Sequence, residues 1–398
     1  MSATETLTYT TLELATPNGP VYRRVATTPP RKPTSEEIPV IDLSNLDGDL
    51  ASRKAIAAKV RAAAEITGFF YVKNHGIQDD KIRGALDKVK TFFDQPAEEK
   101  EKILFSKCGK AGGFHGVGAT QLNKTETAGM SSEGENLDKR IIQQACPSHE
   151  RPPLTQCADR KETFSMRYDS RNDLTNTEPL AHDNPVLADS DKMWSLTTHI
   201  PDFKSTLVEF WQLRLQLARK MIRIFALALD LPENYFDAIT THPGADAVFI
   251  HYPGAPKDKQ DSVDAGIGAH TDIQCLTLLW QDMSGGLQVL SMDGEWLDAA
   301  PIEGTLVVNI GDLLSRLSNN RFKSTVHRVY NRQTASRYSM PFFLGFNPEA
   351  ICEVVSTCVD EEHPALYPPI SAGQVSGTLG CVVDGSLLTF SDSGIRIA

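Results

Sequence analysis

Two kinds of hydrophobic pattern divide this chain. Apolar residues recur every three or four positions from about Ser52 to Ala64, from Asp79 to Phe93 and from Asp202 to about Asp230, which predicts amphipathic helices, the last with Asp202 as its cap. From Ala247 to Pro348 the apolar residues come instead in short, often alternating runs separated by turn residues, which is typical of a β-sandwich or barrel. We therefore expect a mainly β protein with flanking helices (α+β).

The core that best fits this order of elements is a double-stranded β-helix, or jelly roll, backed by the long helix near Asp202. In a jelly roll, strands from opposite sheets surround one central pocket. The patterns divide the chain into five expected segments: an N-terminal arm (1–37), an α/β region (38–107), a loop-rich lid or substrate region (108–201), the long helix with the jelly-roll core (202–373) and a C-terminal tail (374–398).

Charge and cysteine content narrow the class of protein. The net charge is −11, with 40 basic against 51 acidic residues and no cluster of Lys or Arg, so we expect neither nucleic acid nor a membrane as a partner. No apolar run reaches transmembrane length, and Met1–Glu5 does not resemble a secretory signal. The 7 cysteines include no CxxC pair, which favours reduced thiols and a cytoplasmic protein. We expect a monomer, with a dimer as the alternative.

Candidate metal ligands lie in the β-rich part. His270 and Asp272 are two positions apart, so on an extended strand both side chains face the same side. His327 lies in a second alternating run, 324–330. Two imidazoles and one carboxylate converging from two strands form the facial triad of non-haem Fe(II) oxygenases, which leaves coordination positions open for O2 and a co-substrate.

A candidate anion site follows the second histidine. Arg337 and Ser339 repeat the two-residue spacing ten positions beyond His327. A guanidinium matches a carboxylate with two parallel hydrogen bonds, and a hydroxyl can add a third. Either pair by itself occurs often by chance; the ordered set of five residues, followed by Met340–Phe343, is far more specific.

These residues resemble the C-terminal signature of the 2-oxoglutarate- and Fe(II)-dependent dioxygenases, in the branch of isopenicillin N synthase and the plant flavonoid oxygenases. Two N-terminal stretches, 38–43 and 68–77, also resemble that family. The resemblance implies that Arg337 and Ser339 bind the far carboxylate of 2-oxoglutarate. Tyr252 matches a family tyrosine that faces this co-substrate. Ile250 departs from the family, which often has Asn there.

The family resemblance implies an enzyme that oxidises a small organic, specialised-metabolite substrate with release of succinate and CO2. Hydroxylation, desaturation and oxidative cyclisation all remain open, and the sequence does not identify the substrate. Three alternatives stay open: an iron oxidase that does not use 2-oxoglutarate, an ethylene-forming enzyme, and a non-catalytic ligand-binding protein of the same fold.

Overall fold

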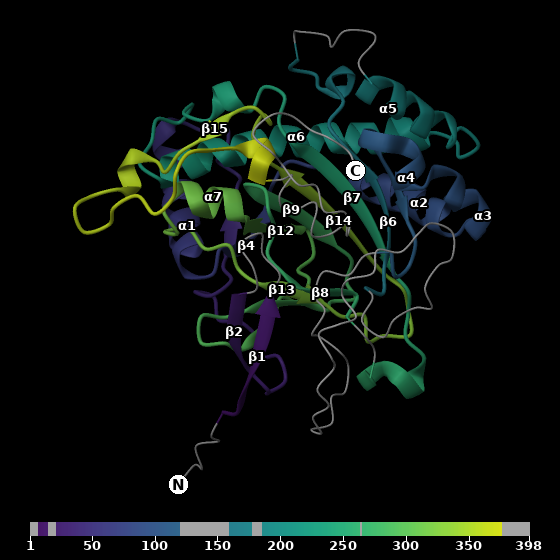
Figure 1. The fold of residues 1–398 in the computed structure, drawn as a ribbon, viewed down its shortest axis with the longest axis horizontal. Helices are drawn as coiled ribbons and strands as arrows, with labels where there is room; N and C mark the ends of the chain where they lie inside the picture. The colour runs from purple at the N-terminus through teal and green to yellow at the C-terminus, as the bar shows by residue number, and fades with distance from the viewer. Residues whose placement is uncertain (1–6, 15–20, 120–158, 177–184, 263–264, 376–398) are drawn as a thin grey trace, which may run out of the picture.

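Two β-sheets form the centre of the molecule (Figure 1). The computed structural model describes residues 7–14, 21–119, 159–176, 185–262 and 265–375. Within them the larger sheet has the strand order β3-β4-β12-β9-β14-β7-β6-β5, and the smaller sheet has the order β11-β10-β13-β8. Neighbouring strands are antiparallel, except that β3 and β4 are parallel. The sheets form the expected jelly-roll core.

The strands of the larger sheet are β3 (Val40–Asp42), β4 (Phe69–Lys73), β5 (Gly112–His115), β6 (Glu162–Met166), β7 (Ala245–Tyr252), β9 (Leu276–Gln281), β12 (Thr305–Ile310) and β14 (Arg337–Leu344). Those of the smaller sheet are β8 (Ile267–His270), β10 (Leu287–Leu290), β11 (Trp296–Asp298) and β13 (His327–Val329). A separate two-stranded pair, β15 (Ile351–Cys352) and β16 (Ile370–Ser371), lies nearer the C-terminus.

Alternation along the strands gives the larger sheet two different faces. Val307 and Tyr252 belong to a buried cluster that also contains Leu287 and Val329 from the smaller sheet. Val308 and the other residues on its side of β12 belong instead to the main hydrophobic core, which also contains the buried residues of the helices. Successive strand residues point to opposite faces, so one face of the larger sheet packs on helices and the other encloses an interior with the smaller sheet.

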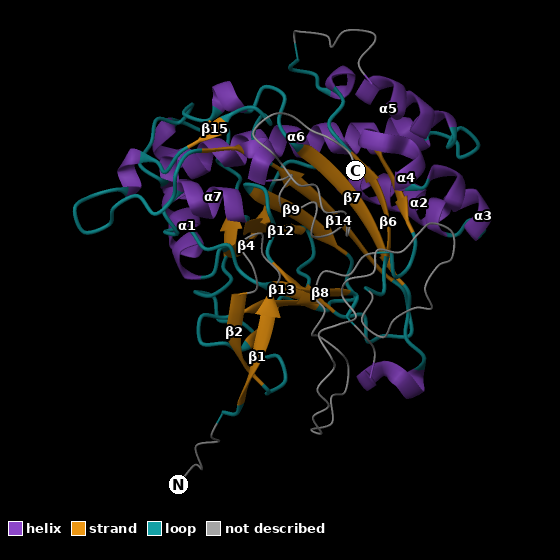
Figure 2. Cartoon of the chain, in the orientation of Figure 1, coloured by secondary structure: helices purple, strands orange, loops and turns teal. Residues whose placement is uncertain are grey.

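Helices cover the outer face of the larger sheet (Figure 2). The main ones are α1 (Leu50–Ile66), α2 (Asp79–Phe93) and α6 (Phe203–Ala228), and the others are α3 (Ala97–Lys100), α4 (Phe105–Cys108), α5 (Pro185–Ser195) and α7 (Asp312–Leu317). The long backing helix is thus present as α6. Asp202 is at the N-cap position of this helix as expected, but its side chain makes no capping hydrogen bond.

A buried arginine joins α6 to the central strand β14. Pro341 of β14 has no N–H group, and the residue pairing of β14 with β7 is interrupted at Met340 and Pro341. The guanidinium of Arg214 donates to the carbonyl oxygens of these two residues at 3.2 and 3.4 Å. Buried carbonyl groups need a donor, so Arg214 supplies hydrogen bonds at the place where the strand pairing is broken.

The N-terminal segment contains a β-hairpin that the sequence pattern did not predict. β1 (Tyr9–Leu14) pairs with β2 (Val21–Ala26). The hairpin packs on the outer side of the smaller sheet through one cluster of buried residues, Leu12, Leu14, Val25, Ala269, Leu290, Trp296 and Val326. Its threonines hid the strand signal, although Thr is a good strand former.

Part of the expected loop-rich region also adopts regular structure. β6 pairs with β7, and β5 pairs with β6, so residues from 108–201 extend the larger sheet at one edge. Residues 120–158 and 177–184 of that region, and most of the expected tail, lie outside the described residues. Gly112 and Gly113 lie in β5, where their positive φ angles of 127° and 132° require glycine.

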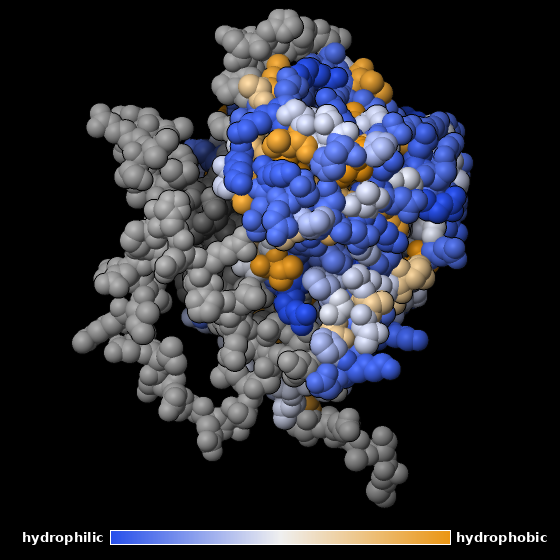
Figure 3. Space-filling view, turned by 90° about the vertical axis from the view of Figure 1, so that its right-hand side faces the viewer, coloured by the Kyte–Doolittle hydropathy of each residue, from blue (hydrophilic) through white to orange (hydrophobic). Residues whose placement is uncertain are grey.

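The surface view in Figure 3 shows a mainly hydrophilic face with hydrophobic residues in small, scattered groups. Among the described residues, no helix combines the length and the apolar character that crossing a bilayer would require.

The packing of α6 leads to a stability prediction. Phe225 is fully buried on α6 and contacts the rings of Phe70 and Phe322. We expect Phe225→Ala to lower the free energy of unfolding by about 3–5 kcal/mol, because it leaves a cavity. Urea denaturation measures this loss. Lys220→Ala, at an exposed position of the same helix, is the control and should change stability by less than about 1 kcal/mol. Equal effects of the two changes would contradict the packing described here.

Candidate functional site

Three potential metal ligands meet at one edge of the smaller sheet. His270 ends β8 and His327 begins β13, and the two residues lie directly opposite each other in the antiparallel pairing. Asp272 lies two residues beyond His270, just after β8 ends. Among the described residues, these three form the group whose ligand atoms all lie within 4.8 Å of one another.

The imidazole rings present the same nitrogen to the centre of this group. The Nδ1 atoms of His270 and His327 lie 2.8 and 3.1 Å from the carbonyl oxygens of Gly268 and Thr325, so each Nδ1–H donates to the backbone. The Nε2 atoms lie 3.8 and 3.7 Å from Oδ1 of Asp272. This hydrogen bonding fixes the tautomer that leaves Nε2 free to bind a metal.

The larger sheet holds the carboxylate. Oδ2 of Asp272 accepts hydrogen bonds from Nδ2 of Asn309 at 2.7 Å and from Oγ1 of Thr277 at 2.5 Å. Asn309 and Thr277 are paired residues on the neighbouring strands β12 and β9. These two donors leave Oδ1 directed toward the histidines, and such orienting bonds are typical around bound metals.

The protonation states of His270 and Asp272 also favour metal binding. Burial and the adjacent His327 ring lower the pKa of His270 to about 3, so this imidazole is neutral at pH 7. Burial would raise the pKa of Asp272, but the two imidazoles and the hydrogen bonds from Asn309 and Thr277 outweigh it and lower the pKa. Metal ligands must be deprotonated, and both groups meet that condition.

Arg337 is buried in the interior between the sheets, 1% exposed. Its Nε donates to the carbonyl oxygen of Gly285 at 2.6 Å, and Nη2 donates to Oε1 of Gln281 at 3.0 Å. Its Nη1 is buried without a hydrogen-bond partner. No ion pair within the described residues neutralises this guanidinium, so the interior contains a positive charge with a free donor. A carboxylate is the group that fits it.

Two further expected residues lie beside Arg337. The ring of Tyr252 lies 4.7 Å from the guanidinium carbon, and its hydroxyl is 3.5 Å from Oγ of Ser339. Ser339 pairs with Ile250 across β14 and β7, so the neighbouring position is apolar. A Cβ atom at Gly266 would lie 2.6 Å from the Tyr252 ring. Gly266 lies four residues before His270, so Tyr252 packs against the segment that leads into β8.

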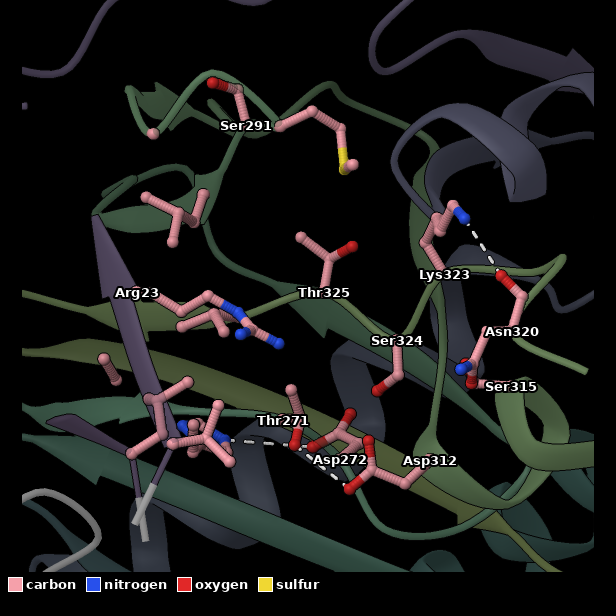
Figure 4. Close-up of a pocket in the computed structure, with 18 of the residues that line it drawn as sticks. Arg23, Thr271, Asp272, Ser291, Asp312, Ser315, Asn320, Lys323, Ser324 and Thr325 are labelled. Atoms are coloured by element: carbon pink, nitrogen blue, oxygen red, sulfur yellow. Dashed lines mark hydrogen bonds and ion pairs between the residues drawn. The ribbon is translucent and has the colours of Figure 1, made fainter. Parts of the chain in front are cut away.

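A cavity of about 1330 Å³ opens beside the candidate ligands. Its lining includes His270 and Asp272, with residues of the hairpin and of the segments that flank β10 and β13 (Figure 4). It does not include His327, Arg337, Ser339 or Tyr252. The structure therefore separates an open side, next to the candidate metal ligands, from an enclosed side around Arg337.

Sequence reasoning found the five residues of the signature but not the residues that orient them. Thr277 and Asn309 orient Asp272, while Gln281 and Gly285 hold Arg337. The only signal in the sequence was a polar residue at an inward position of an apolar strand, as at Asn309 in Thr305–Ile310.

Comparison with known families gives two matches. Residues 244–346 match the sequence model of the 2OG-Fe(II) oxygenase superfamily. Residues 38–188 match the model described as non-haem dioxygenase in morphine synthesis N-terminal. The first match contains all three candidate metal ligands as well as Arg337 and Ser339.

Similar proteins extend over nearly the whole chain. The 2-oxoglutarate-Fe(II) type oxidoreductase ppzC of Metarhizium majus is 36% identical over 96% of this chain and 96% of its own length. The 2-oxoglutarate-Fe(II) type oxidoreductase hxnY of Emericella nidulans is 33% identical over 84% of this chain and 86% of its own. The crystal structure of a full-length Neurospora crassa protein in complex with alpha-KG and thymine aligns with a TM-score of 0.66 at 29% identity, covering 86% of this chain and 96% of that chain.

The hydrogen bond from Thr277 predicts an effect on metal affinity. Thr277→Val keeps the side-chain shape but removes a donor to Asp272, so we expect Co(II) affinity to fall by about 10- to 100-fold. Anaerobic titration measures it, with Asp272→Ala as the reference for loss of a ligand. Thr325→Val is the matched control, because the Thr325 side chain lines the cavity without bonding to Asp272. Full Co(II) affinity in both Thr277→Val and Asp272→Ala would exclude this metal site.

Proposed function

Because the chain belongs to the 2-oxoglutarate- and Fe(II)-dependent oxygenase superfamily, we propose that His270, Asp272 and His327 bind its iron. The proposal is supported by the convergence of their ligand atoms and by the backbone carbonyls that fix both imidazoles. Three ligands on one side leave positions for 2-oxoglutarate and O2.

The protein is a 2-oxoglutarate-dependent Fe(II) dioxygenase. Iron and 2-oxoglutarate together supply the oxidising chemistry, in which O2 oxidises the organic substrate while 2-oxoglutarate is converted to succinate and CO2. The protein contributes binding, orientation and exclusion of water. His270 and His327 present Nε2, while Thr277 and Asn309 keep one oxygen of Asp272 directed at the same point.

We propose that the enclosed side of the interior binds 2-oxoglutarate, with its far carboxylate on Arg337. One observation carries this proposal: Nη1 of Arg337 is buried and has no partner. An unsatisfied donor on a charged group costs at least about 1–3 kcal/mol, which a bound carboxylate recovers. Ser339 adds a second hydrogen bond, and Tyr252 supports the guanidinium with its ring face.

The open side is our candidate for the substrate. Its volume of about 1330 Å³ exceeds the roughly 300–1,000 Å³ common for small-molecule pockets. The related Neurospora crassa protein has been crystallised with both alpha-KG and thymine, so a relative binds a small molecule together with the co-substrate. We propose a small organic substrate of specialised metabolism, oxidised by hydroxylation, desaturation or oxidative cyclisation.

We propose a separate role for each segment of the chain, on the basis of the same geometry. Residues 202–373 supply the iron and 2-oxoglutarate sites, and residues 38–107 support the larger sheet. We assign substrate selection to residues 108–201 together with the N-terminal segment before residue 38. We also propose a cytoplasmic monomer; the four described cysteines, Cys108, Cys275, Cys352 and Cys358, are free thiols.

Replacement of Arg337 tests the co-substrate site. We expect Arg337→Leu to weaken 2-oxoglutarate binding by about a hundredfold or more, because each hydrogen bond to a charged group contributes roughly 1.5–3 kcal/mol. Co(II) affinity should stay unchanged. Calorimetric titration of 2-oxoglutarate into Co(II)-loaded protein measures the effect, and Arg332→Leu, at an exposed position five residues earlier, is the matched control.

Two outcomes would count against this assignment. If Arg337→Leu lowers the melting temperature but leaves 2-oxoglutarate affinity intact, Arg337 is structural. If the unmodified enzyme consumes O2 without forming succinate, it is an oxidase that does not use 2-oxoglutarate, as in the alternative raised by the isopenicillin N synthase resemblance.

A further inference from the structure

Two charged side chains face the open cavity from different elements, and neither has an oppositely charged partner at ion-pair distance among the described residues. One is Arg23 on β2 of the N-terminal hairpin, and the other is Asp246 on β7 of the larger sheet. They come from separate elements and have opposite signs. The residues around each side chain indicate which charged group of a ligand would bind to it.

Arg23 lies on the inward face of the hairpin. It pairs directly with Leu12, and cross-strand partners share a face. Leu12 and Val25, on this face, are buried against the smaller sheet, but Arg23 remains exposed because it borders the cavity. Figure 4 shows its side chain extending into the cavity toward Thr271 and Ser324. Its one hydrogen bond to a described residue is a 3.5 Å contact with the Tyr22 carbonyl oxygen.

The other basic residues at the cavity have partners. Arg24 stacks on the Tyr9 ring at 3.5 Å. Nζ of Lys323 donates to the carbonyl oxygen of Asn320 at 2.9 Å. Arg23 therefore has the geometry of an anion-binding group, and its guanidinium matches a carboxylate in particular.

Asp246 lies in the same row of the larger sheet as the residues that hold the candidate metal ligand. Phe343 pairs with Asp246 on one side and with Thr277 on the other, so Asp246 faces the interior about 10 Å from Thr277 by strand spacing. Oδ2 of Asp246 accepts a hydrogen bond from Nε2 of Gln274 at 3.2 Å. This position places a carboxylate at the level of the metal site.

The charge of Asp246 is incompletely compensated. Burial raises its pKa, and Arg167, whose guanidinium acts from beyond ion-pair distance, only partly offsets this. Arg167 itself lies against the Phe105 ring. A cationic ligand group next to Asp246 would stabilise its ionised form, so this side of the cavity suits a basic nitrogen.

We propose that the substrate is a zwitterion of the amino-acid type, with its carboxylate bound by Arg23 and its basic nitrogen bound by Asp246. This rests on the proposed function, since it assigns the open side of the site to the substrate. The two charges bind both ends of the molecule in the cavity that His270 and Asp272 also line. A neutral molecule, or one with a single charge, leaves one of the two side chains without a partner.

Calorimetry on the full chain, loaded with Zn(II) and 2-oxoglutarate to prevent turnover, tests the proposal. The probes are the common L-amino acids and, for the tightest binder, the amine that lacks its carboxylate and the acid that lacks its amino group. Each truncated probe should bind about tenfold or more weakly than the amino acid, because each loses a hydrogen bond between charged groups.

Variants at the two positions should give opposite patterns. Arg23→Gln should weaken binding of the amino acid by about tenfold or more. Its affinity for the carboxylate-free amine should equal that of the unmodified enzyme. Asp246→Asn should do the reverse, retaining the acid that lacks the amino group. Arg24→Gln and Asp293→Asn, two other charged residues at the cavity, are the controls and should leave all three affinities unchanged.

The proposal is overturned if no amino acid binds, if thymine as a neutral probe binds as tightly as any amino acid, or if either variant weakens all probes equally. Binding of 2-oxoglutarate, measured first on the same Zn(II)-loaded samples, separates this result from failure of the proposed function. Its loss in the unmodified protein would refute the co-substrate site, whereas its retention without amino-acid binding would refute only the zwitterion.

Discussion

The site depends on the hydrogen bonds that hold Asp272 between two sheets. Its two partner histidines belong to the smaller sheet, whereas Thr277 and Asn309, which bind its other oxygen, belong to the larger one. The three ligand atoms can therefore converge only when the sheets are correctly spaced. That spacing is set by the apolar residues packed between them, including Val289 and Val307. The hydrophobic interior of the jelly roll thus sets the geometry of the candidate metal ligands.

The interior between the two sheets also contains a buried charged group. Burying an unpaired charge is unfavourable, yet Arg337 is almost completely buried and keeps one donor without a partner. Its other donors reach Gly285 and Gln281, and the positive φ angle of 78° at Gly285 favours a residue without a side chain there. These contacts hold the guanidinium in position before any ligand arrives. Such preorganisation lowers the free-energy cost of ordering when a carboxylate binds.

Much of this arrangement could be predicted from the sequence, because the alternation of side chains along a strand depends only on residues close together in the chain. The spacing of His270 and Asp272 and the order of His327, Arg337 and Ser339 indicated the candidate site residues, although Asp272 lies beyond the end of β8. Long-range contacts were not accessible. The bond from Asn309 to Asp272 joins residues 37 positions apart, and the docking of the N-terminal hairpin depends on a surface formed by Ala269 and Leu290. A polar residue within an apolar strand was the only sign of the first contact, and the second left no pattern in its own segment.

The central claim is that one interior binds the metal and 2-oxoglutarate together. It is tested most directly by measuring Co(II) affinity with and without saturating 2-oxoglutarate, and 2-oxoglutarate affinity with and without Co(II). Shared contacts predict that each ligand strengthens the other by the same factor, because coupling between binding sites is reciprocal. Independent binding of the two ligands, with affinities unchanged by the partner, would contradict the account.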